Sequence, residues 1–178
     1  DLDCTAVYHH AKSNGISFYL LYLYKILTAI NETEPFRYRI DAAGKVVVYD
    51  KIGVGPTIPR DDGTFGYGHM HYQTDLDLFI AGAKKEIEHV KKTTGLKPEG
   101  HIDIIHFSAL PWIKFTSVSH ARIYSFPDSV PKISVGKVTE TDNKYTMPFS
   151  IHVHHGLVDG YDVGVFIKKL EELFEQFN

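Results

Sequence analysis

Apolar positions recur with a helical period in three parts of the 178-residue chain. The clearest case is 75–92, where apolar side chains three and four residues apart mark one face. That face consists of Leu76, Phe79, Ile80, Ala83, Ile87 and Val90. Thr74 can cap this helix and Gly95 can end it. The pattern therefore predicts an amphipathic helix over 75–92.

Two further helices are predicted near the chain's ends. The run 14–31 is apolar and aromatic, with Lys25 near its end, which is typical of a helix packed in a core. The last helix is predicted to begin just after Asp159 and Gly160. Its apolar face has helical spacing and consists of Val163, Phe166, Ile167, Leu170, Leu173 and Phe174.

Strands are predicted between these helices. Segments 36–40 and 45–50 form a hairpin through 41–44, and 63–73 alternates like a strand. The second half is strand-rich, with candidates at 101–108, 115–124, 132–140 and 144–155. Together the elements predict an α/β (α+β) fold, in which helices cover a mixed, largely antiparallel sheet in a two-layer sandwich.

Composition and charge narrow the class of protein. The hydrophobic share of 43% is enough for one sizeable core, so we expect a single domain over 1–178. A net charge of −3 without a block of like charge argues against a nucleic-acid partner. Cys4 is the sole cysteine, and no apolar stretch is long enough to span a bilayer. We expect a reducing, cytoplasmic setting and no membrane partner.

The stretch "IHVHHGLVDG", 151–160, carries the candidate chemistry. Strand alternation puts His155 on the apolar face with Ile151, and His154 on the other face. We therefore expect His155 to be desolvated, with the neutral form that a general base requires. Asp159 can accept backbone N–H bonds at the helix start, or pair with an arginine. On spacing alone the run does not identify a catalytic site, because His and Asp near turns are common.

Three ordered segments resemble the chloramphenicol acetyltransferase family. They are "FSALPWIKFTS" at 107–117, "KISVGK" at 132–137 and "MPFSIHVHHGLVDGYDVGVFI" at 147–167. The resemblance extends back to 14–40 and so covers nearly the whole chain. The family's arginine that pairs with the aspartate lies upstream of Asp1, as does an aromatic patch of its antibiotic pocket. We therefore expect a native N-terminal segment to be missing from this sequence.

The resemblance implies roles for five residues. His155 matches the general base, and Ser108 matches the serine that stabilises the tetrahedral oxyanion. Ser134 stands where the family has a threonine that holds a water at the same intermediate. Asp159 matches an aspartate that supports the site, and Trp112 matches a tryptophan near the coenzyme channel.

The resemblance also implies the reaction and the assembly. Acetyl-CoA is a co-substrate, with no permanently bound cofactor, and acetyl passes directly to a hydroxyl of chloramphenicol or a similar small molecule. The subunits form a homotrimer with active sites at the interfaces. A CoA-dependent acyltransferase with another acceptor is an alternative, since dihydrolipoamide acyltransferase cores share the His-x-x-x-Asp-Gly pattern. A related ligand-binding protein without turnover is another.

The acceptor pocket is expected to be more polar than in the family. The candidate substrate-binding residues are Phe65, Tyr67, Trp112, His120, Arg122 and Lys132. In an alignment without gaps, the last three fall where the family mostly carries aliphatic residues, and Tyr67 replaces a small residue. Unpaired charges facing an apolar antibiotic would weaken its binding. A shift of register would instead turn Ser119 and Ala121 inward.

A metal site is the remaining candidate. His152 and His154, two apart on one strand face, could bind zinc together with His69 and His71, also two apart. Neither a second cysteine nor a clear carboxylate accompanies them. We therefore expect no metal, and His101 carries no spacing signal.

Overall fold

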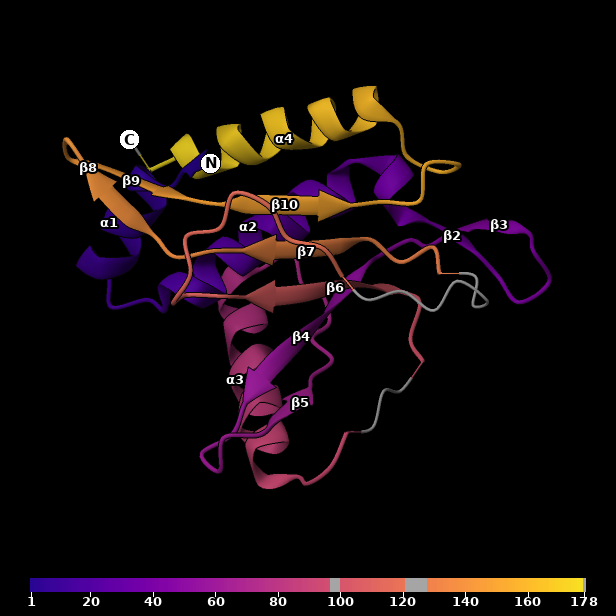
Figure 1. The fold of residues 1–178 in the computed structure, drawn as a ribbon, viewed down its shortest axis with the longest axis horizontal. Coiled ribbons are helices and arrows are strands. Elements are labelled where there is room, and N and C mark those ends of the chain that lie inside the picture. The colour runs from indigo at the N-terminus through magenta and orange to yellow at the C-terminus, as the bar shows by residue number, and fades with distance from the viewer. Residues whose placement is uncertain (97–99, 121–127, 178) are drawn as a thin grey trace.

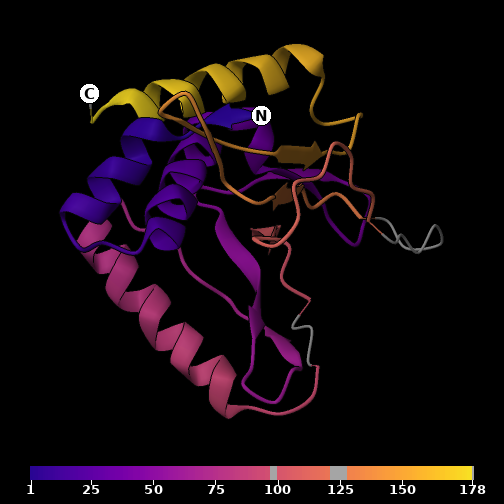
Figure 2. The same cartoon turned by 60° about the vertical axis from the view of Figure 1, so that its left-hand side comes forward.

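Helices cover one side of a mixed sheet in the computed structural model, which describes residues 1–96, 100–120 and 128–177 (Figure 1). The helical elements are α1 (Thr5–Ser13), α2 (Phe18–Glu32), the 3-10 turn η1 (Glu34–Arg37), α3 (Leu76–Lys92) and α4 (Gly160–Glu175). The turned view in Figure 2 shows α1, α2 and α3 on one side of the sheet. The predicted α/β sandwich is confirmed.

The strands build one central sheet and two smaller ones. They are β1 (Leu2–Asp3), β2 (Tyr38–Ile40), β3 (Val46–Val48), β4 (Gly53–Pro59), β5 (Phe65–Tyr67), β6 (Ile104–Ala109), β7 (Lys132–Val135), β8 (Thr139–Thr141), β9 (Lys144–Met147) and β10 (Phe149–His152). The central order is β10-β7-β6-β4-β5, parallel across β7, β6 and β4 and antiparallel at both edges. Strand β9 lies between β1 and β8, and β2 pairs with β3 as the predicted hairpin.

Helix α2 is the centre of the core. Most of its residues are buried, and it contacts α1, α3 and α4. Its buried Lys25 donates to Gln176 Oε1 at 2.9 Å, and Nζ lies 4.6 Å from the centre of the Phe177 ring. These partners lessen the cost of burying a charge that desolvation disfavours. Among the described residues, no helix combines the length and the apolar character needed to cross a bilayer.

Several predicted boundaries were wrong: the predicted strand 63–73 is reduced to β5, and the predicted strand 132–140 is split into β7 and β8. Asp75, not Thr74, caps α3, since its Oδ1 accepts the N–H of Leu78 at 2.9 Å. Pro148 divides the predicted strand 144–155 into β9 and β10, because proline has no N–H to continue a ladder. Residues 115–120 form no strand, and the rest of the predicted strand, 121–124, lies outside the described residues.

Arg39 holds the β2–β3 hairpin against the start of β6. Its side chain is 0% exposed. The guanidinium donates to the carbonyls of Phe36 at 3.0 Å, Tyr38 at 2.6 Å and Ile104 at 2.6 Å, and also to that of Ile102. Burial lowers the pKa of Arg39 to about 10, so the group stays charged at neutral pH. One side chain therefore satisfies four carbonyls from two distant segments.

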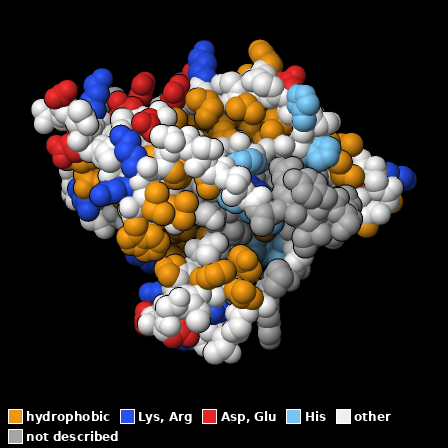
Figure 3. All heavy atoms as spheres, viewed as in Figure 1, with side chains coloured by type: hydrophobic (Ala, Val, Ile, Leu, Met, Phe, Trp, Pro, Cys, Tyr) orange, Lys and Arg blue, Asp and Glu red, His pale blue; other side chains and the backbone are white. Residues whose placement is uncertain are grey.

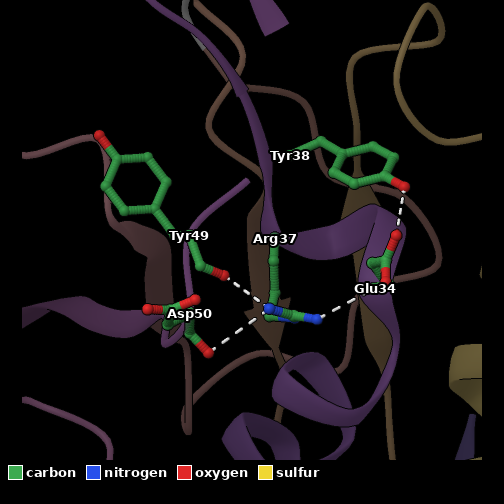
Figure 4. Close-up of polar contacts among 5 residues, drawn as sticks. All are labelled: Glu34, Arg37, Tyr38, Tyr49 and Asp50. Atoms are coloured by element: carbon green, nitrogen blue, oxygen red, sulfur yellow. Dashed lines mark hydrogen bonds and ion pairs between the residues drawn. The ribbon is translucent and has the colours of Figure 1, made fainter. Parts of the chain in front are cut away.

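Arg37 lies two residues earlier and makes weaker contacts near the surface (Figure 4). Its Nη1 donates to the Tyr49 carbonyl at 2.7 Å, and its Nη2 lies 3.9 Å from Glu34 Oε2. The Glu34 side chain is largely exposed, so this ion pair contributes little. Arg37 therefore serves as a control for Arg39.

We predict that Arg39→Lys lowers the free energy of unfolding by about 3 kcal/mol, because lysine cannot reach four carbonyls with a fork of donors. Urea unfolding followed by circular dichroism measures the change. Arg37→Lys should cost less than about 1 kcal/mol. Equal losses in the two variants would contradict the role assigned to Arg39.

Candidate active site

Serines from three neighbouring strands form a row across the central sheet. In the register of the sheet, Ser108 of β6 lies beside Ser134 of β7, which lies beside Ser150 of β10. The adjacent Phe107 and Ile133 are buried in the core. Because side chains alternate along a strand, the serines point to the opposite face. This row therefore places two of the candidate catalytic residues on adjacent strands.

Two histidines cover the middle of this row. His120 Nε2 lies 3.2 Å from Ser134 Oγ, and its ring meets that of His152 edge-on at 5.0 Å. His120 therefore lies beside a candidate catalytic serine, and its place in an acceptor pocket stays a prediction. His152 Nδ1 is buried and has no hydrogen-bond partner among the described residues. This face of the sheet is therefore lined by imidazole and hydroxyl groups.

Lys132 carries a paired charge. It is buried on β7 and its Nζ forms an ion pair with Asp128. Burial alone would raise the pKa of Asp128, but the hydrogen bond from Lys132 holds it below its usual value. The expectation of an unpaired Lys132 facing the acceptor is therefore wrong. Arg122 lies outside the described residues.

His155 lies in an exposed turn. Strand β10 ends at His152, and the His154 carbonyl then accepts the N–H of Leu157 at 2.9 Å and of Val158 at 3.1 Å. Strand alternation stops where the chain bends, so His155 does not continue the apolar face. The predicted desolvation of His155 is wrong for the single chain. Its role as the base stays a prediction.

Asp159 fixes the end of this turn. Its Oδ1 accepts the N–H of Asp162 at 3.0 Å, and Asp162 Oδ2 accepts the N–H of Asp159 at 3.0 Å. This reciprocal capping box, whose N-cap Asp159 lies four residues after His155, starts α4 at Gly160. The cap predicted for Asp159 is confirmed, whereas pairing with an arginine is untested.

The segment after Ser108 returns to the end of β7. The N–H of Leu110 donates to the Val135 carbonyl at 2.8 Å, and the N–H of Lys137 donates to the Ile113 carbonyl at 2.8 Å. Trp112 projects from this loop with 76% of its surface exposed. It is therefore not a core aromatic in the single chain, and its place near a coenzyme stays a prediction.

The two candidate aromatics on β5 lie away from the serine row. Phe65 and Tyr67 are exposed, with ring centres 5.8 Å apart. Strand β4 separates β5 from β6, which places them about 10 Å from the Ser108 strand. The single chain does not bring them to Ser134.

His155 and Ser108 are also separated within one chain. β10 runs antiparallel to β7, and its end at His152 is about 7 Å along the strand from the Ser150 position. Two strand spacings, about 10 Å, separate β10 from β6. Figure 1 shows the end of β6 and the segment after β10 at opposite ends of the sheet, because the two strands run in opposite directions. Within one chain, His155 and Ser108 are therefore too far apart to contact the same small molecule.

Sequence reasoning missed two polar residues at this face. Asp128 lies four residues before Lys132. That spacing predicts an ion pair only within a helix, and 128–132 is not helical. The strand period assigns His152 to the correct face. Its contact with His120, however, joins segments that are 32 residues apart in the sequence. No local pattern announces such a contact.

A family model described as chloramphenicol acetyltransferase matches residues 1–171. The chain belongs to the chloramphenicol acetyltransferase family. Chloramphenicol acetyltransferase 3 of Escherichia coli is 29% identical over 97% of this chain and 82% of its own length. A chloramphenicol acetyltransferase of Clostridium perfringens is 25% identical over 99% of this chain and 82% of its own. As a member of this family, the chain is an acyltransferase.

Solved structures agree with the family. A chloramphenicol acetyltransferase structure superposes with a TM-score of 0.88 at 31% identity, covering 98% of this chain and 85% of its own. The cubic core of a pyruvate dehydrogenase multienzyme complex superposes with a TM-score of 0.69 at 17% identity, over 98% and 79% of the two chains. The second likeness shows the fold shared with that core.

We predict that Asp159→Ala lowers the free energy of unfolding by about 1 kcal/mol, because the α4 cap is lost. Asp159→Asn should be nearly neutral if capping is the whole role, since Asn caps equally well. Thermal unfolding of both variants measures this. An equal loss in Asp159→Asn would show that the charge itself has a partner.

Proposed function

We propose that this chain transfers acetyl from acetyl-CoA to a hydroxyl of chloramphenicol or a similar small molecule. The observation that carries the proposal is the turn between β10 and α4, where a capped helix start presents His155 to solvent. The family membership supports the same chemistry. Cys4 is buried, and burial raises the pKa of its thiol to about 12, so it is not the nucleophile.

His155 acts as general base in the proposed reaction. It takes the acceptor's hydroxyl proton while the oxygen attacks the thioester carbonyl, and it returns the proton as the C–S bond breaks to release CoA. A base of this kind contributes about 10²–10⁴-fold to the rate. The Ser108 hydroxyl donates to the oxyanion, and loss of one such donor costs about 3 kcal/mol. Ser134, against His120, holds a water at the same intermediate.

Each active site lies between two subunits of a homotrimer in this proposal. The separation of His155 from Ser108 within one chain supports it, because a neighbouring subunit can supply the missing group. The exposed apolar side chains support it too. They include Phe65, Tyr67, Trp112, Ile113, Tyr161 and Val165. Figure 3 shows apolar patches on the sheet face that the helices leave uncovered.

The natural acceptor is more polar than chloramphenicol in this proposal. The face beside Ser134 carries His120 and the buried His152 Nδ1, which has no hydrogen-bond partner in the described part of the chain, where an acceptor would bind. An acceptor that offers hydrogen-bond donors would satisfy such a group, whereas an apolar ring would leave it unpaired. Lys132 is paired with Asp128, so it does not offer a free charge to the acceptor.

We expect acetyl-CoA to release free thiol in the presence of chloramphenicol, and His155→Ala to lower kcat by several orders of magnitude without unfolding the protein. A coupled thiol assay measures the rate. His154→Ala is the matched control and should keep most activity. Loss in His154→Ala alone would overturn the assignment of the base.

The same assay tests the acceptor. Slow acetylation that does not saturate with chloramphenicol would support a different natural acceptor. A low-micromolar KM with rapid turnover would contradict the polar pocket. Absence of thiol release with chloramphenicol and with polar alcohols would favour a ligand-binding protein without turnover.

We expect coexpressed His155→Ala and Ser108→Ala chains to regain activity. Random mixing makes about a quarter of the sites combine an intact His155 with an intact Ser108 from another subunit. The mixed protein should therefore show about a quarter of the wild-type rate, whereas each variant alone is nearly inactive. Sites contained within one chain would leave the mixture as inactive as its parents.

A further inference from the structure

Two histidines and an aspartate meet at the end of the central sheet where β4 and β6 begin. The candidate ligand atoms of His69, His101 and Asp103 all lie within 4.8 Å of one another. His101 Nδ1 lies 3.7 Å from Asp103 Oδ1, and the His69 and His101 ring centres are 4.1 Å apart. The exposed His71 ring lies 4.4 Å from that of His69. The cluster brings together His69 and His101, which are 32 residues apart in the sequence.

Backbone pairing fixes the segment that carries His69. Gly68 N–H donates to the Pro56 carbonyl at 2.9 Å, and Val54 and Met70 exchange two bonds of 2.9 Å. The N–H of His69 itself donates to Glu86 Oε1 of α3 at 2.9 Å. The His69 backbone is therefore pinned on both sides to β4 and to a helix.

The segment with His101 and Asp103 is pinned as firmly. The Asp103 carbonyl accepts the N–H of Gly53 at 2.9 Å. Arg39 binds the carbonyls of Ile102 and Ile104 on either side. Both ligand-bearing segments thus lie against β4 with little backbone freedom, so a ligand that joins them meets a largely preformed arrangement.

The donor set selects the kind of ligand. Two imidazole nitrogens and one carboxylate oxygen suit a divalent first-row transition ion and not Mg²⁺ or Ca²⁺, which take oxygen ligands. Tetrahedral Zn²⁺ with bonds near 2.0–2.1 Å holds its ligand atoms roughly 3.4 Å apart. The 3.7 Å separation of His101 Nδ1 from Asp103 Oδ1 is close to that spacing. The His101 and Asp103 side chains are partly exposed, so solvent reaches this cluster, and a cavity of about 360 Å³ borders it at His69 and His71.

We propose that His69, His101 and Asp103 bind a zinc-type divalent ion, with water in the fourth position. The ion links the segment before α3 to the start of β6. This site differs from the four-histidine zinc site weighed from the sequence, because His152 lies against His120 and not against His69. It also replaces the expectation that the protein binds no metal, and it does not depend on the acetyl-transfer activity.

Zinc titration of the chelator-treated, full-length protein tests the site. Isothermal calorimetry should give one ion per chain, and zinc at about a hundredfold above Kd should raise Tm by roughly 5–10 °C. His101→Asn and Asp103→Asn should each weaken binding by at least about tenfold. His9→Asn, which changes an exposed histidine of α1, and His155→Asn should bind zinc as the wild type does.

A variant that gains a signal separates a true loss of metal binding from a loss caused by misfolding. His101→Cys should retain Co²⁺ and add a sulfur-to-cobalt charge-transfer band, since Cys4 is buried and protonated and cannot supply that thiolate. Zinc affinity unchanged in both His101→Asn and Asp103→Asn, or lost in His155→Asn, would overturn the proposal. Absence of the thiolate band from a folded His101→Cys protein would overturn it as well.

Discussion

One buried guanidinium constrains the middle of this fold. Arg39 has no access to water, and its guanidinium donates hydrogen bonds to carbonyls of η1, β2 and the start of β6. A buried cation is costly unless such partners surround it, so its position and theirs are specified together. Strand β6 begins at one of these carbonyls and carries Ser108 near its other end. The geometry of the candidate site therefore depends on a contact at the far end of the same strand.

The central sheet has two faces with different chemistry. One packs on α2 and its neighbours, and the other carries the serine row, His120 and His152. Among the described residues no helix covers this second face, although Ser134 in its middle is buried beneath His120, and the exposed Trp112 lies in the loop that follows Ser108. Ser108, near the end of β6, and His155, after β10, lie at opposite ends of that face.

Local patterns in the sequence predicted what local physics determines. The helical faces of α3 and α4 were correct because burial recurs at three and four residues. The capping by Asp159 followed from its position before a helix. What failed depended on chain reversal or on distant partners. His155 left the strand period at a turn, and Lys132 found Asp128 outside any helix. The cluster of His69, His101 and Asp103 exists only because β4 lies between their segments.

The buried thiol of Cys4 gives the fold an internal reporter. It lies between β1 and α1, donates to the Tyr145 carbonyl at 3.3 Å, and has no exposed surface. Alkylating reagents attack the thiolate, so modification requires this corner of the molecule to open. The rate of labelling at one natural position then measures how often the pairing of β1 with β9 breaks. Mass spectrometry can follow that local opening without an engineered label and without interference from other thiols.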